Sequence, residues 1–180
     1  MRSDLHQVYW EGDRPKNTLN LLACILLAAA HVPMPSLYAE IEINAPRPVV
    51  WQALIAKHNW FRWNTFLYDL SPNQALRQGT TVLLSIKRAP KEEETEIQPR
   101  ITLLQTDTCL RWRYVAPGIQ TEHTFELQDL GGDRTQYIHR EMLSGSLGRL
   151  FFPFIRRDEQ QGLHRMALEL KRYTERYSLK

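Results

Sequence analysis

The chain has 180 residues, of which 43% are hydrophobic and 24% charged, so it is long and apolar enough to bury one core without a second domain. Its formal net charge of +3 is too small for a dedicated nucleic-acid-binding protein. Two cysteines cannot build a disulfide framework or a zinc site. Reduced, buried cysteines are typical of the cytoplasm, where we expect the protein to reside.

Residues 1–36 are interpreted as an extension that precedes a domain over 37–180. The stretch LNLLACILLAAAHV, residues 19–32, is apolar but short for a bilayer-spanning helix. Charges of both signs before it argue against a signal peptide. Two interpretations stay open: a short apolar helix, or a segment that is not translated because Met34 is the true start.

Residues 37–64 are predicted to form a strand, a helix and an aromatic turn. Apolar residues alternate at period two from Leu37 to Ile43, which is typical of a half-buried strand. Prolines then open a helix over RPVVWQALIAK, residues 47–57. The tract HNWFRWN, residues 58–64, fits a turn or one short helical stretch. Within it we expect Trp63 in the core, and Trp60 and Phe61 at the rim of a pocket.

Residues 80–144 show the period-two alternation of an antiparallel sheet. Pro99 marks an edge strand or a bulge, and Gly131-Gly132-Asp133 predicts a tight hairpin turn. The strand-like segments are TTVLLSIKR, TEIQPRITLLQ, TCLRWRYV, EHTFELQDL and RTQYIHREML.

From residue 147 to 178 the apolar residues recur at helical spacing, which predicts one long helix with a bend or restart near Pro153. Residues 146–180 also carry most of the basic surplus. A solvated helix face explains this surplus most simply, and weak contact with a membrane surface, aided by residues 19–32, is the alternative.

Five motifs in this order resemble the START-related SRPBCC superfamily, which includes polyketide cyclase/dehydratase-like and birch-pollen-allergen-like proteins. They are EIEINAPRPVVWQAL, WFRWNTF (with Thr65 where proline is common), HTFELQD, RTQYIHREMLSG and the helix from LGRLFF onward. The resemblance implies an α+β helix-grip fold. In that fold a curved antiparallel sheet of six to seven strands wraps around the long C-terminal helix, with one or two short helices after the first strand. A concave sheet over one helix is expected to leave an apolar cavity.

Candidate ligand-binding residues are those expected to face this cavity. Whether the last strand turns His139 and Glu141 inward, or Ile138 and Met142 instead, is left open by the pattern, because both faces have apolar members. The candidates are Trp60, Phe61, Leu84, Trp112, Tyr114, His123, Phe125, His139, Glu141, Phe154 and Met166.

The function expected from fold and residues is binding or transport of a small hydrophobic molecule, such as a lipid, an isoprenoid or a polyketide-like ring system. The alternative is a cyclase- or dehydratase-type enzyme that uses His123, His139 or Glu141 as acid–base groups. No metal-ligand spacing or phosphate-binding loop occurs in the sequence, so we expect neither a metal nor a cofactor. The oligomeric state does not follow from the sequence.

Overall fold

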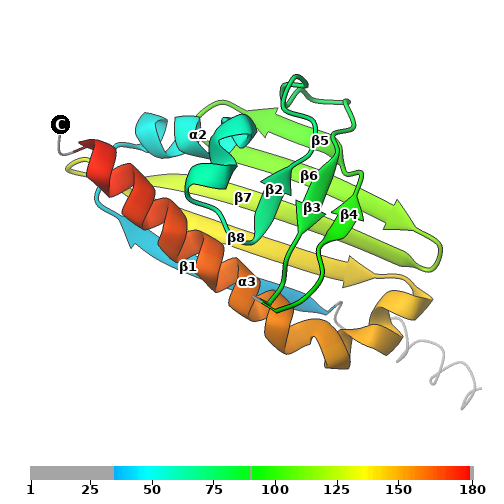
Figure 1. Ribbon diagram of the computed structural model, residues 1–180. Helices are drawn as coiled ribbons and strands as arrows, with labels where there is room; N and C mark the ends of the chain where they lie inside the picture. The colour runs from blue at the N-terminus through cyan, green and yellow to red at the C-terminus, as the bar shows by residue number, and fades with distance from the viewer. Residues whose placement is uncertain (1–34, 90, 179–180) are drawn as a thin grey trace, which may run out of the picture. The chain divides into compact units, whose positions relative to one another are not determined.

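The computed structural model describes residues 35–89 and 91–178 (Figure 1). The predicted N-terminal extension lies outside the described residues except for Pro35 and Ser36. The elements, in chain order, are β1 (Ser36–Ile43), α2 (Arg47–Ile55), the 3-10 helix η1 (Lys57–Arg62), β2 (Leu67–Asp69), β3 (Leu84–Ile86), β4 (Thr95–Ile97), β5 (Arg100–Gln105), β6 (Cys109–Ala116), β7 (Ile119–Gly131), β8 (Arg134–Ser144) and α3 (Ser146–Ser178).

The strands form two antiparallel sheets, one in the order β1-β8-β7-β6-β5 and a smaller one in the order β2-β3-β4. An isolated antiparallel bridge pairs Thr81, in the segment before β3, with Arg100 of β5. The prediction of a single strand over residues 95–105 is wrong: it splits around Pro99, which has no N–H to donate, into β4 and β5 in different sheets. The described residues therefore hold eight strands, more than the six to seven expected, within the α+β helix-grip fold that the sequence predicted.

The long helix α3 lies across one face of the five-stranded sheet and contacts β1, β7 and β8 (Figure 1). Its buried side chains recur at three- and four-residue spacing, as the sequence predicted, because one stripe of the helix faces the sheet. Pro153 lies inside the helix, which continues through it. In the described part of the chain no helix, α3 included, is both long and apolar enough to span a membrane. The buried stripe includes Leu163, Met166, Ala167 and Leu170.

The aromatic tract HNWFRWN forms most of η1 and the turn after it. Trp60 is 0% exposed: its indole N–H donates to the Leu54 carbonyl at 3.0 Å, and its ring centroid lies 6.3 Å from that of Trp112. The expectation that Trp60 stands at a rim is therefore wrong, because a buried ring with a satisfied N–H belongs to the core. Trp63 is buried as expected and stacks on Tyr173, with centroids 5.9 Å apart.

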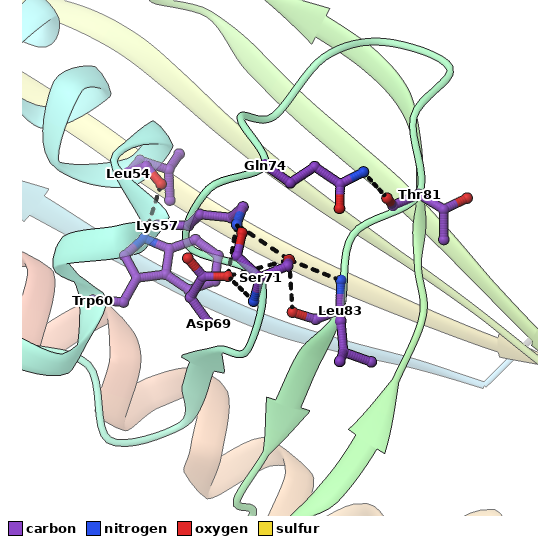
Figure 2. Close-up of polar contacts among 8 residues, drawn as sticks. All are labelled: Leu54, Lys57, Trp60, Asp69, Ser71, Gln74, Thr81 and Leu83. Atoms are coloured by element: carbon purple, nitrogen blue, oxygen red, sulfur yellow. Dashed lines mark hydrogen bonds and ion pairs between the residues drawn. The ribbon is translucent and has the colours of Figure 1, made fainter.

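A buried ion pair ties η1 to the small sheet (Figure 2). Lys57 Nζ lies 2.6 Å from Asp69 Oδ1, with both side chains almost completely buried, and it also donates to the Ser71 carbonyl. The Ser71 hydroxyl in turn accepts from the Leu83 N–H at 3.0 Å. A lysine at the start of η1 therefore fixes the segments that flank β2 and β3.

Candidate functional site

A cluster of polar side chains occupies the face of the large sheet that α3 covers. Strand pairing sets Trp112 of β6 opposite His123 of β7, and His123 opposite Glu141 of β8. His139 lies two residues before Glu141 and therefore on the same face. Both are buried. Of the alternative pair, Ile138 is also buried and Met142 is exposed, but His139 lies beside Phe66 and Glu141 beside Glu159 of α3, so these two side chains are on the covered face.

Two of these side chains form a histidine pair in the interior. His123 Nδ1 lies 3.1 Å from His139 Nε2, so one ring donates and the other accepts. The ring of Phe125 packs against that of His139, with centroids 4.1 Å apart. Burial lowers the pKa of His123 to about 3 and, with the neighbouring His123, lowers the pKa of His139 well below its usual value. Both imidazoles are therefore neutral near neutral pH.

Beyond the histidine pair the cluster continues to a carboxyl pair and an arginine. His123 Nε2 lies 3.8 Å from Glu141 Oε1. Glu159 of α3 lies close to Glu141 and accepts a hydrogen bond from Nε of Arg88, which follows β3. The cluster thus runs from the buried face of the sheet to Arg88, whose side chain is partly exposed.

The pKa values of the two carboxyl groups respond differently to this environment. Burial raises the pKa of Glu141 well above its usual value, and the nearby Glu159 raises it further. Burial also raises the pKa of Glu159, but the charge of Arg88 and its hydrogen bond oppose this effect. Glu141 is therefore the protonated partner, and as a neutral acid it can donate a hydrogen bond to the Glu159 carboxylate.

Besides Glu141 Oε2 and Glu159 Oε1, three further polar atoms in this interior are buried without a hydrogen-bond partner among the described residues. They are the indole nitrogen Nε1 of Trp112, the hydroxyl of Tyr137 and Nδ1 of His139. Tyr137 lies in β8 on the same face as His139 and Glu141. A buried polar atom without a partner costs free energy, and three in one apolar region could all be satisfied by a molecule with hydrogen-bonding groups.

The sequence-predicted candidates fall into three groups. Trp60, Leu84, Trp112, His123, Phe125, His139, Glu141 and Met166 are all buried. Tyr114 is half-buried and lines a separate surface cleft of about 420 Å³ with Leu83 and Ile97. Phe154 is 77% exposed, so the expectation that its ring faces the interior is wrong, while Phe61, expected at a rim, is 70% exposed.

Three members of the cluster were missed as candidates by sequence reasoning. Glu159 lies four residues before the buried Leu163, and this helical spacing was a usable signal for a carboxylate on the covered face of α3. Tyr137 shares the alternation of His139 in β8, and this period-two spacing was a usable signal for it. Arg88 follows a strand in an irregular segment, where no periodicity points to its partner.

Comparison with known proteins gives matches in structure and none in sequence. No family model and no curated protein matches the sequence. A START superfamily protein from Mycobacterium smegmatis is 12% identical, with a TM-score of 0.61 over 79% of this chain and 98% of that one. A norcoclaurine synthase variant from Thalictrum flavum is 14% identical, with a TM-score of 0.59 over 81% and 96%.

An aromatase/cyclase from a Streptomyces species is 16% identical, with a TM-score of 0.58 over 78% of this chain and 95% of that one. At such identities the likeness concerns the fold alone. It agrees with the element order and the sheet topology described above. The chain has the START-related helix-grip fold, with a cluster of buried ionisable side chains between its sheet and its long helix.

Proposed function

We propose that the protein binds a small, largely apolar molecule between the five-stranded sheet and α3, and that this molecule carries at least one hydroxyl or carbonyl group. The single observation behind the proposal is the set of three buried atoms without partners, on Trp112, Tyr137 and His139. A lipid, an isoprenoid or an oxygen-bearing polycyclic compound has this combination of an apolar body and a few polar atoms.

The chemistry of the region supports a ligand of that kind. The rings of Trp112 and Phe125 lie 4.6 Å apart between centroids and supply an apolar, aromatic surface. A neutral His139 and a tyrosine hydroxyl can each donate or accept a hydrogen bond. Small-molecule sites typically combine such a surface with a few polar groups that fix the orientation of the ligand.

Native mass spectrometry of the protein purified from its own host tests the proposal directly. The expected result is a bound species of small mass that is released on unfolding. A panel of lipids, isoprenoids and aromatic polyketides is then screened by the shift in melting temperature. If no species is retained and no compound in the panel raises the melting temperature, the proposal fails and ordered water satisfies the three atoms.

The substitution Tyr137→Phe sharpens the test, because it removes only the unpartnered hydroxyl. We expect the free protein to keep or gain stability, since a buried group without a partner is lost. Affinity for the identified ligand should fall about tenfold, the value of one hydrogen bond. Tyr68→Phe is the matched control, because the Tyr68 hydroxyl donates to the Thr65 carbonyl outside this interior.

An enzyme with acid–base chemistry in the same interior is the second candidate. The observation that favours it is the convergence of His123, His139 and Glu141, with a neutral carboxylic acid 3.8 Å from a neutral imidazole. The protonated Glu141 can deliver a proton near neutral pH, while the lowered pKa values of the two histidines make them weak bases there. Once a ligand is known, Glu141→Gln and His139→Ala should each abolish its turnover. Unchanged rates would leave binding as the function.

A further inference from the structure

The first turns of α3 carry large apolar side chains that face solvent. We call Leu147, Leu150, Phe151 and Phe154 the α3 stripe; their exposed fractions are 42%, 62%, 48% and 77%. Their spacing of three, four and seven residues places them along one side of the helix. Exposed apolar side chains gathered in one place usually mark a contact surface.

The same part of the chain is positively charged. Residues 145–157 contain three arginines, Arg149, Arg156 and Arg157, and no acidic residue before Asp158. All three arginines are exposed, and no ion pair in the described part of the chain engages them. An apolar stripe flanked by cations is complementary to a lipid surface, which has an apolar interior beneath anionic headgroups.

The fold holds this surface in place. Backbone N–H groups of Leu147 and Gly148 donate to the Gly118 carbonyl in the turn between β6 and β7, at 3.0 and 3.2 Å. Phe152, on another side of the helix, packs against the core. The start of α3 is therefore held against the rest of the domain. Gly148 and Phe152 are on the side of the helix that faces the protein, and the α3 stripe is on the side that faces solvent.

We propose that the α3 stripe and its arginines dock the protein on an anionic lipid surface. The four apolar side chains enter the interface while Arg149, Arg156 and Arg157 stay at the level of the lipid phosphates. The stripe spans about 12 Å of helix, so four side chains on it form too small a patch to bury the roughly 800 Å² per partner of a standard protein–protein interface. A membrane needs no such matching area, because a short amphipathic segment with cations suffices. This proposal does not depend on what the interior binds.

Flotation of the full chain with phosphatidylcholine vesicles, with and without about one third phosphatidylglycerol, tests it. We expect binding to the anionic vesicles alone, weakening as salt rises. The double substitution Leu150→Ser/Phe154→Ser should reduce binding at least tenfold. Its matched control is Leu168→Ser, which removes an exposed leucine from the distal half of the same helix.

A second pair of variants tests whether vesicle binding requires the arginines. Arg156→Gln/Arg157→Gln should weaken binding by roughly fivefold for each arginine removed. Arg172→Gln/Arg176→Gln, a change of equal charge at exposed positions near the end of α3, should have little effect. The proposal is overturned if the full chain ignores anionic vesicles at low salt, or if it binds them equally well without Leu150 and Phe154. Self-association that Leu150→Ser/Phe154→Ser abolishes, in a protein that binds no vesicle, would assign the stripe to a second copy of the chain.

Discussion

His123 Nδ1 lies 3.1 Å from His139 Nε2, and both imidazole rings are fully buried. Because burial lowers both pKa values, the unfolded chain binds more protons than the folded chain between about pH 3 and 6.5. The free energy of unfolding should therefore fall as the pH drops through that window, by up to about 1.4 kcal/mol per pH unit for each histidine. In His123→Gln, urea denaturation at several pH values should show a weaker dependence of the free energy of unfolding on pH. The difference should correspond to about one bound proton fewer. His58→Gln, an exposed position on η1, is the control, and equal slopes in all three proteins would contradict the prediction.

The carboxyl pair gives a prediction of opposite sign. A raised folded-state pKa means that Glu141 holds its proton where the unfolded chain has lost it, so this residue lowers stability as the pH rises above about 4.5. Glu141→Gln copies the neutral acid, so its free energy of unfolding should match that of the original protein within about 1 kcal/mol below about pH 4.5, where both side chains are neutral. At higher pH the variant should be the more stable protein.

Glu159→Gln is the informative partner of that variant. It removes the anion that accepts from Arg88, and the loss should cost about 1–3 kcal/mol near neutral pH. Urea denaturation of both variants across the pH range distinguishes the two carboxyl groups. A larger loss for Glu141→Gln than for Glu159→Gln near pH 6 would mean that Glu141, rather than Glu159, carries the charge.

Much of the fold could be predicted because its signals are local. The alternation from Leu37 to Ile43, the glycine turn at 131–132 and the helical spacing after residue 147 each describe one element, and the structure has all three. The split at Pro99 was harder to predict. Proline lacks an N–H donor both in an edge strand and where the chain passes from one sheet to another, so the residue alone does not distinguish the two cases.

The site was predictable only in part, because it joins elements that lie far apart in the chain. Alternation placed His123, His139 and Glu141 on one face of each strand, but strand pairing decided which face is covered. Glu159 and Arg88 meet across a sequence separation of 71 residues, which no local pattern encodes. The mistaken rim position of Trp60 has the same origin, since its burial depends on Trp112 in a distant strand.

The burial of Trp60 leads to a stability prediction. Trp60→Ala removes a fully buried ring and its hydrogen bond to Leu54, so it should lower the free energy of unfolding by about 3–5 kcal/mol. Phe61→Ala, at the neighbouring exposed position, should cost less than about 1 kcal/mol. Chemical denaturation of the two variants measures both values. A small effect of Trp60→Ala would show that the ring is not part of the core.

The buried ion pair between Lys57 and Asp69 should behave as a unit. Lys57→Met leaves the Asp69 carboxylate buried without its cation and should cost about 3–5 kcal/mol. The double variant Lys57→Met/Asp69→Leu should recover part of that loss, because no charge remains buried. Additive losses in the double-mutant cycle would contradict the role of the pair in joining η1 to the small sheet.

Close packing between α3 and Phe66 gives the last prediction. A Cβ at Gly162 would clash with two ring carbons of Phe66, and that ring is fully buried beside His139. An alanine would normally stabilise a helix interior by about 0.5–1 kcal/mol relative to glycine. Here the clash should dominate, and Gly162→Ala should lower the free energy of unfolding by about 1–3 kcal/mol. Combining it with Phe66→Leu should relieve the clash, so the double variant should lose less than the sum of the two single changes. If Gly162→Ala stabilises the protein by itself, α3 does not approach the Phe66 ring this closely.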